Sequence, residues 1–460
     1  MNDLNTLNIT TALDALRGRK ITPQDLAAAC LSETERLNSA LKAFITVNDL
    51  QTALNLEPAP NVPAVLVNAL RGIPNAVKDL FDTAGIRTTI GSRFFADHVP
   101  TEDAFVVEKL RQSGATILGK TNTHEIALGV TGDNPHFGTA RNPWNRDRIP
   151  GGSSSGSAIA VATGMALGAL GTDTGGSIRI PASLCGIVGF KPTYGRVSTR
   201  GVFPLSWNLD HVGPLVKSVK DAALMLQIMA VYDPLDPASV KMLTGDYLGH
   251  LEDDVKGRKI ALGIGDFVEA ADPEILKAVR EAAKVFESVG CKVQEVDVSW
   301  LKEAALANKL MTQSDGAAVH RERLKEHPEL FGDDIRRRLE DGANTPLADY
   351  ILARRTQAEV RKKFEEFFES YDFLILPTTP IAAPTIEGHD AVEQAGRLTR
   401  FTAPFNLAGL PALSLPCGFT KDGLPIGLQI VSRAWGEFKV LNIAHAFEQA
   451  TEWHKRMPAL

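Results

Sequence analysis

PGGSSSGSAIAVATGMALGALGTDTGGSIRIPASLCGIVG, residues 150–189, is the stretch that decides how this chain is interpreted. Two loops rich in glycine and serine, residues 151–157 and 172–177, flank a run of small, mostly apolar residues. Flexible linkers are also rich in Gly and Ser. However, they do not contain a run of apolar residues such as the one that joins these two loops. Glycine lets one backbone approach another closely, so a small-residue helix can pack tightly. We therefore predict a first loop, a buried helix over about residues 156–165, a short strand over about 166–171 and a turn that presents Ser177.

Three general motifs match parts of the chain only imperfectly. Residues 152–156 fit the G-x-S-x-G nucleophile elbow, but that elbow needs a preceding strand, and residues 141–150 form a polar segment bounded by prolines. A phosphate-binding loop needs Lys followed by Ser or Thr after its last glycine, whereas a Ser-Ala pair follows here. Residues 299–302 fit S-x-x-K without the motifs that should accompany it. None of the three explains the stretch.

Segments spread along the chain instead resemble the amidase signature family, whose members hydrolyse amides with a lysine, a bridging serine and a nucleophilic serine. Besides the quoted stretch, the matching segments are GIPNAVKDLF (72–81), NPW (142–144), FKPTYGRVS (190–198), LPTTP (376–380) and NLAGLPALSLPCG (406–418). The resemblance covers nearly the whole chain. It implies that Lys78 is the base, Ser153 the bridging serine and Ser177 the nucleophile.

The local sequence around Lys78 leaves its role open. The lysine lies in a short apolar segment, residues 75–81, and lysine is almost never fully buried unless it is paired. An ion pair with Asp79 or Asp82, or a side chain that reaches solvent, would satisfy that rule. However, burial also lowers the pKa of a lysine, and a neutral amine can accept the proton of a hydroxyl. Together with the serine loops, this favours catalysis.

The turn before Ser177 is expected to bind an oxyanion. Pro181 suits an early helical position and Gly186 a helix end, so backbone N–H groups just ahead of the helix would surround a small concave nest. Such a nest stabilises a developing oxyanion. The expected oxyanion-binding residues, which act together with the N–H of Ser177, are Thr174, Gly175 and Gly176. Asp173 and Arg179 are expected to brace the turn as an ion pair.

A further glycine-rich loop, residues 129–138, lies beside the scissile bond in the family that the chain resembles. The resemblance therefore assigns substrate binding to Gly129, Val130 and Thr131. His124 and His136 lie near and in this loop, and histidine is the usual proton shuttle. Because no Ser-His-Asp arrangement accompanies them, we expect them to serve a helix start and loop packing.

The composition is that of an ordinary globular protein. Apolar residues make up 44% and charged residues 23% of the 460 residues, and a net charge of −6 provides no basic surface of the kind that binds nucleic acid. The four cysteines have no disulfide or metal-ligand spacing, and neither a leader peptide nor a membrane-spanning segment is recognised. We therefore expect a cytoplasmic enzyme without metal or cofactor that contacts neither nucleic acid nor membrane. Its expected partners are a small-molecule amide and water, and a homodimer is left open.

The order of the expected elements is that of an α/β protein. Strand and helix patterns alternate along most of the chain, and the resemblance implies one domain over residues 1–460, with a large mixed β-sheet flanked by helices on both faces. Within it we expect an N-terminal helical arm (8–50), a catalytic core (66–220) and a helical region that walls the substrate pocket (301–370). Residues 123–129 are expected to form a helix.

Three functions are compatible with these motifs. The first is an amidase that cleaves a carboxamide through an acyl-enzyme and releases ammonia or an amine. The alternative is the glutamine-hydrolysing A subunit of the tRNA-dependent amidotransferase. The third, an inactive scaffold with the same fold, is disfavoured because all three catalytic positions are intact.

The first two functions differ in what the pocket must recognise. Glutamine needs an acid for its α-ammonium and a cation for its α-carboxylate. In the A subunits that the chain resembles, an aspartate precedes the Asn-Leu-Ala-Gly segment at the position where this chain has Thr399, beside Arg400. Those A subunits also have an arginine that binds the carboxylate. Its position corresponds to Gln357 in this chain, and other arginines lie nearby. Because an unpaired buried charge costs several kcal/mol, we predict poor turnover of glutamine and faster turnover of an amide that is neutral or carries only a carboxylate.

Overall fold

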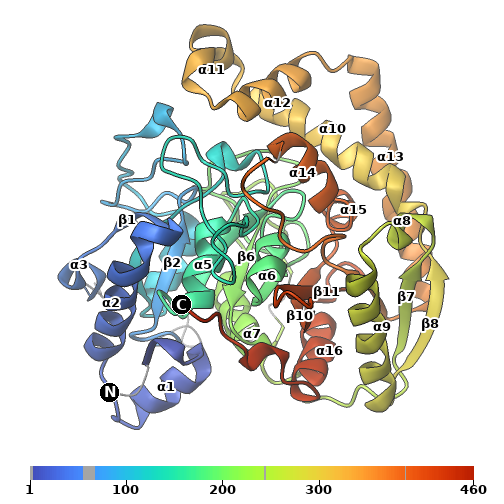
Figure 1. Cartoon of the computed structure of the whole chain (residues 1–460), viewed down its shortest axis with the longest axis horizontal. Coiled ribbons are helices and arrows are strands. Elements are labelled where there is room, and N and C mark those ends of the chain that lie inside the picture. Colours follow the sequence, from blue (N-terminus) through green and yellow to red (C-terminus); the bar gives the residue numbers. More distant parts are fainter. Residues whose placement is uncertain (1–3, 55–67, 243–244, 389) are drawn as a thin grey trace.

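The computed structural model describes residues 4–54, 68–242, 245–388 and 390–460 (Figure 1). The start of the expected catalytic core, residues 66 and 67, lies outside the described residues. Eleven strands form one sheet. In spatial order they are β1 (Phe44–Val47), β3 (Thr116–Thr121), β2 (Pro74–Lys78), β4 (Gly168–Asp173), β6 (His211–Val216), β5 (Val188–Lys191), β10 (Ala412–Phe419), β11 (Pro425–Val431), β9 (Phe373–Pro377), β7 (Lys259–Ile264) and β8 (Lys292–Asp297). The pairs β3–β2, β2–β4, β9–β7 and β7–β8 are parallel and the others antiparallel, so the sheet is mixed, as expected.

Helices cover both faces of this sheet. Successive residues of a strand point to opposite faces. On β4, a Cβ added at Gly168 would touch Met225 of α7 (Val219–Met229), whereas a Cβ at Gly171 would touch the hydroxyl of Ser154, which precedes α5 (Ser155–Thr163). α7 and α5 therefore pack on opposite faces, and glycine on β4 allows both to come close.

The elements around Ser177 form where the small-residue pattern predicts them. α5 is buried along its whole length, which explains why it has no polar face. At Gly156 a Cβ would lie 2.0 Å from the carbonyl oxygen of Ala43, so only glycine fits there. After the turn, α6 (Arg179–Cys185) ends at Gly186, whose φ of 74° is the left-handed value that favours glycine.

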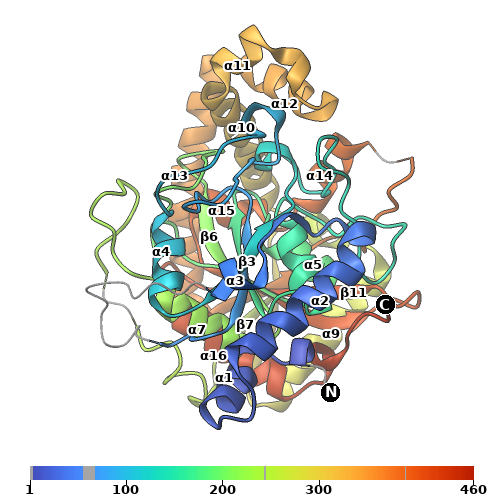
Figure 2. The same cartoon turned by 90° about the vertical axis from the view of Figure 1, so that its left-hand side faces the viewer.

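Two helical groups lie at the margins of the sheet. The expected N-terminal arm contains α1 (Ile9–Arg17) and α2 (Pro23–Leu41), which lie at the lower left in Figure 1 and face the viewer in Figure 2. The side chain of Thr22 caps α2 by accepting a hydrogen bond from the N–H of Asp25. The second group projects from one end of the molecule and consists of α10 (Leu301–Val319), α11 (Arg321–Glu326), α12 (Asp333–Ala343) and α13 (Leu347–Ser370).

The remaining α-helices connect strands or cover the sheet. They are α3 (Leu50–Leu54), α4 (Phe105–Gln112), α8 (Asp266–Glu269), α9 (Pro273–Ser288), α14 (Ala391–Leu398), α15 (Ala403–Ala408) and α16 (Glu437–Gln449), and the 3₁₀ helices are η1 (Leu4–Thr6), η2 (Arg93–Phe95), η3 (Glu125–Ala127), η4 (Pro328–Leu330) and η5 (Trp453–Lys455). The helix expected over residues 123–129 is wrong. Only η3 forms there, because Ile126 and Ala127 adopt positive φ values that an α-helix cannot contain. Across the described ranges, none of the helices is both long and apolar enough to cross a bilayer.

Candidate active site

Lys78 and Ser153 meet in the buried centre of the molecule. Lys78 is the last residue of β2, and Ser153 lies in the first Gly-Ser loop, after a cis peptide bond from Gly152. The Nζ of Lys78 lies 2.7 Å from Oγ of Ser153 and 2.7 Å from Oγ1 of Thr172, on β4. Both Lys78 and Ser153 are completely buried. Strand β2 therefore brings the lysine to the loop that carries Ser153.

Burial suits Lys78 to act as a base. Removal from water lowers its pKa from 10.5 to about 7, although the negative charges of Asp173 and Asp210 act in the opposite direction. A base is most effective when its pKa lies near the working pH. About half of the Lys78 side chains would then be neutral at pH 7, by the definition of a pKa.

The alternative role for Lys78, an ion pair with Asp79 or Asp82, is wrong. The Oδ1 of Asp79 lies 3.6 Å from Nζ of Lys120, a second buried lysine on β3. Asp82 lies 3.7 Å from Nε2 of His98. Within the described residues, Lys78 has no ion-pair partner.

Ser177 stands at a small pocket of about 70 Å³. Its Oγ forms no hydrogen bond with any other described residue, so it faces the pocket without a competing partner. The N–H of Gly176 already donates to Oδ1 of Asp173 at 2.7 Å. That contact narrows the expected oxyanion site to the N–H groups of Thr174, Gly175 and Ser177, which make no hydrogen bond within the described residues.

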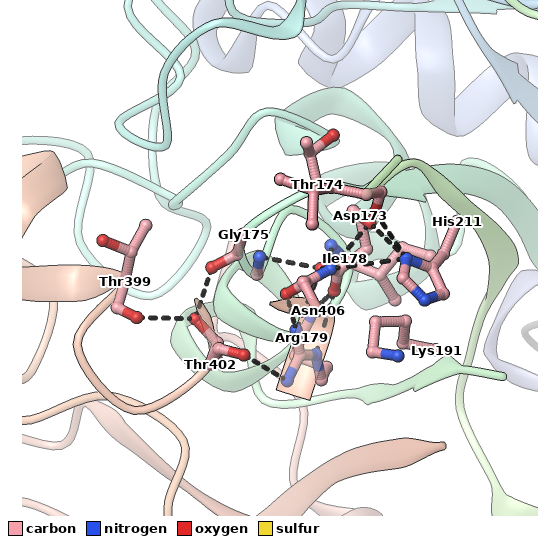
Figure 3. A network of polar contacts seen from close by, with 12 residues as sticks. Asp173, Thr174, Gly175, Ile178, Arg179, Lys191, His211, Thr399, Thr402 and Asn406 are labelled. Atoms are coloured by element: carbon pink, nitrogen blue, oxygen red, sulfur yellow. Dashed lines mark hydrogen bonds and ion pairs between the residues drawn. The ribbon is translucent and has the colours of Figure 1, made fainter. Parts of the chain in front are cut away.

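The predicted ion pair between Asp173 and Arg179 is confirmed (Figure 3). Nη2 and Nε of Arg179 lie 2.9 and 3.0 Å from the two carboxylate oxygens, and both side chains are fully buried. Arg179 also donates to the carbonyl of Thr402, to Oε1 of Gln429 and to Oδ1 of Asn406. Although burial alone would raise the pKa of Asp173, the guanidinium brings it below its usual range. The pair ties the turn to α15 and β11.

The loop that the resemblance assigns to substrate binding contributes in part. Gly129 and Val130 line the pocket beside Ser177. Thr131 does not line it, because its hydroxyl is buried and lies 3.4 Å from Nδ1 of His124. The Nε2 of His124 lies 2.9 Å from Oδ2 of Asp334 on α12. Neither His124 nor His136 lines the pocket, in agreement with the packing roles expected for them.

The charged groups that line the pocket are cations. Lys309 on α10 and Arg338 on α12 line it, and no described aspartate or glutamate does. Arg338 donates to the carbonyl of Ala391 and its Nε lies 3.7 Å from Asp334. The pocket therefore favours an anionic or neutral group. No cluster of His, Cys, Asp or Glu able to hold a metal ion occurs in the parts of the chain that the structure describes.

The residues that were expected to replace the glutamine-binding pair lie in different places. Thr399 lines the pocket. Arg400 does not, because its Nε donates to the carbonyl of Phe267 and its guanidinium covers the ring of that residue. Arg400, although next to Thr399 in sequence, therefore does not face a ligand in this pocket. Gln357 is buried and donates to the carbonyl of Leu407, away from the pocket.

Sequence reasoning missed three polar residues that contact Lys78 or the turn before Ser177. Thr172 contacts Lys78, Asn308 on α10 donates to the carbonyl of Thr174 at 3.1 Å, and Asp210 accepts a hydrogen bond from the Thr174 hydroxyl at 2.6 Å. Burial raises the pKa of Asp210 to about 6. Thr172 lies in the quoted stretch, but Asn308 and Asp210 belong to segments with no motif that marks them.

Comparison with known proteins agrees with this geometry. The Amidase family model matches residues 25–441. The chain belongs to the amidase signature family. It is therefore an enzyme that acts on amide C–N bonds. Among its relatives is the A subunit of the glutamyl-tRNA(Gln) amidotransferase of Geobacter metallireducens, 39% identical over 98% of this chain and 99% of the relative.

Solved structures of relatives share the fold. The A subunit of the glutamyl-tRNA(Gln) amidotransferase of Thermotoga maritima is 34% identical, with a TM-score of 0.85 over 98% of this chain and 96% of that one. A vestigial protein complex, said to reveal the evolutionary origins of an s-triazine catabolic enzyme, contains a chain that is 32% identical. It has a TM-score of 0.89 over 96% of this chain and 98% of that one.

These names overturn the expectation about partners. A relative that is named as one subunit works in an assembly, and an amidotransferase named for glutamyl-tRNA(Gln) acts with a nucleic acid. The expectation of a chain that works with nothing but a small amide and water, or as a homodimer, is therefore wrong. A net charge of −6 does not exclude such partners, because in an assembly other subunits can contact the nucleic acid.

Proposed function

We propose that the chain hydrolyses a carboxamide with Ser177 as nucleophile, Ser153 as bridging serine and Lys78 as base. Neutral Lys78 accepts the proton of Ser153 while Ser153 accepts that of Ser177, whose oxygen attacks the amide carbon. The C–N bond then breaks, and the nitrogen leaves with the proton that Ser153 returns. Water hydrolyses the resulting ester and regenerates the serine.

The observation that carries this proposal is the buried contact of 2.7 Å between Lys78 and Ser153, with a lysine pKa of about 7. The N–H groups of Thr174, Gly175 and Ser177 would stabilise the oxyanion. Gly129 and Val130, which line the pocket, would hold the substrate.

We further propose that the chain is the amide-hydrolysing member of a larger assembly, the glutamine-hydrolysing A subunit of a tRNA-dependent amidotransferase. Full-length identity of 39% and 34% with chains of that name supports this role. In this reading the released ammonia is used by partner chains.

The pocket favours a second candidate, an amide other than glutamine that carries a carboxylate. The pocket offers Lys309 and Arg338 to a carboxylate, but no described acidic side chain to the α-ammonium of glutamine. Both cations come from residues 301–370, so we propose that this region sets specificity.

A comparison of three amides tests both candidates. Ammonia release is measured for glutamine, for succinamate, which keeps a carboxylate but has no ammonium, and for neutral propionamide. Fastest release from glutamine supports the role in an amidotransferase, and release from succinamate at least tenfold faster than from glutamine supports the second candidate. Release by Ser177→Ala at the rate of the unaltered protein would contradict the proposed mechanism.

A further inference from the structure

A second cavity adjoins the catalytic residues. It has a volume of about 520 Å³ and shares Ala127, Thr174 and Leu205 with the pocket beside Ser177. Thr172, which accepts the hydrogen bond of Lys78, also lines it. The cavity therefore reaches the same reaction centre as the smaller pocket, with different walls.

His211 lines this cavity and has an unpaired ring nitrogen. The Nδ1 of His211 lies 3.1 Å from the carbonyl oxygen of Asp173 (Figure 3). It also lies 2.6 Å from the carbonyl oxygen of Leu209, and two acceptors require this nitrogen to carry the proton. The Nε2 is then an acceptor. It is buried and has no hydrogen-bond partner among the described residues. Because Nε2 itself is not accessible from the cavity, the case for the ligand rests on the other lining groups.

The charges of the cavity are opposite to those of the smaller pocket. Asp210 and Asp236 line the cavity, and both accept hydrogen bonds from backbone N–H groups. The Nε of Arg200, the one lining cation among the described residues, is held 2.7 Å from Asp233. Aromatic side chains, which attract cations through their ring faces, complete the wall: they are Tyr194, Phe203 and Trp207. The cavity thus suits an amine or ammonium, whereas the pocket beside Ser177 suits a carboxylate.

We infer that this cavity receives the amine part of the substrate, an N-substituent that carries hydrogen-bond donors or a positive charge, while the pocket beside Ser177 receives a small acyl part. The inference rests on the proposed function and refines its second candidate. The volumes agree with this division. About 70 Å³ holds only a small group, whereas about 520 Å³ lies within the range of roughly 300–1,000 Å³ that is usual for ligand pockets.

The chemistry places the leaving group on this side. When the bond from Ser177 to the amide carbon forms, the C–N bond breaks and the nitrogen takes the proton held by Ser153. Ser153 and Thr172 both contact Nζ of Lys78, and Thr172 lines the cavity. The amine therefore leaves toward the cavity, and water then hydrolyses the ester that remains in the small pocket.

A matched pair of amides tests this assignment. N-(3-aminopropyl)succinamate carries a second, charged nitrogen on its N-substituent, and N-butylsuccinamate carries an uncharged N-substituent of the same length. We expect kcat/KM to be at least tenfold higher for the aminopropyl amide.

Substitutions at the mouth of the cavity locate the effect. Leu235 lines the cavity and is 73% exposed, so Leu235→Lys and Leu235→Glu should both fold. Leu235→Lys should lower the preference for the aminopropyl amide at least fivefold, and Leu235→Glu should keep or raise it. Leu306→Lys, at an exposed position of α10 outside the cavity, is the matched control and should leave the preference unchanged.

The outcomes separate the two proposals. Equal kcat/KM for the two N-substituted amides, or a preference that Leu235→Lys leaves intact, would overturn the cavity assignment while the Ser177 mechanism stands. Failure of Ser177 to become acylated, with no turnover of any amide, would instead refute the proposed Ser177 mechanism.

Binding of propane-1,3-diamine to Ser177→Ala then decides whether the cavity takes an amine. Binding that Leu235→Lys weakens supports this, and absence of binding contradicts it.

Discussion

The pH at which Ser177 becomes reactive should follow the titration of Lys78. Only the neutral amine can accept a proton, so the rate must rise with pH. The fall of the Lys78 pKa from 10.5 to about 7 corresponds to about 5 kcal/mol of free energy, at 1.36 kcal/mol for each tenfold change in proton affinity. With a midpoint near pH 7, the neutral fraction rises about tenfold between pH 6 and pH 8 and then levels off.

The assay is the second-order rate of acylation by a fluorophosphonate, which reports on the nucleophile without knowledge of the substrate. Measured from pH 5 to pH 10, the rate should reach a plateau above pH 8. Lys78→Arg keeps a cation but cannot deprotonate, so it should react at least a thousandfold more slowly. A rate that continues to rise tenfold per pH unit between pH 8 and pH 10 would show a lysine with an ordinary pKa, and would refute the reasoning.

Three further substitutions test other parts of the site. The Asp210 carboxylate raises the pKa of Lys78, so Asp210→Asn should move the midpoint of the same pH profile to lower pH. Arg179→Met leaves a buried carboxylate unpaired and should lower the free energy of unfolding, measured in urea, by about 3–5 kcal/mol; an unchanged value would refute the bracing role. Gly156→Ala places a Cβ against backbone and should lower the melting temperature, whereas Gly396→Ala, with open space around it, should not.

The local elements were predictable because short-range chemistry determines them. The small residues of α5 leave no polar face, and Thr22 with Pro23 starts α2. The pairing of Asp173 with Arg179 was also accessible, since the two residues flank one turn. In each case, the residues that determine the local structure lie close together in the sequence.

Contacts between distant segments were not predictable in this way. The pocket joins the loop of Gly129 to Asn308 and Arg338, and only the packing of α10 and α12 brings these residues together. The same holds for the cavity that His211 lines. The error at η3 has a local cause, since Ile126 adopts a left-handed conformation that no sequence pattern marks. The charge of the pocket therefore became visible only with the structure.

The central claim, that Ser177 carries the acyl group, is tested most directly by locating a covalent adduct. The protein is treated with a fluorophosphonate, and the modified peptide is identified by mass spectrometry. The account predicts one adduct, on Ser177, that disappears in Ser177→Ala and persists in Ser154→Ala and Ser155→Ala. An adduct on Ser154 or Ser155 would restore the nucleophile-elbow reading of the first loop and contradict the account.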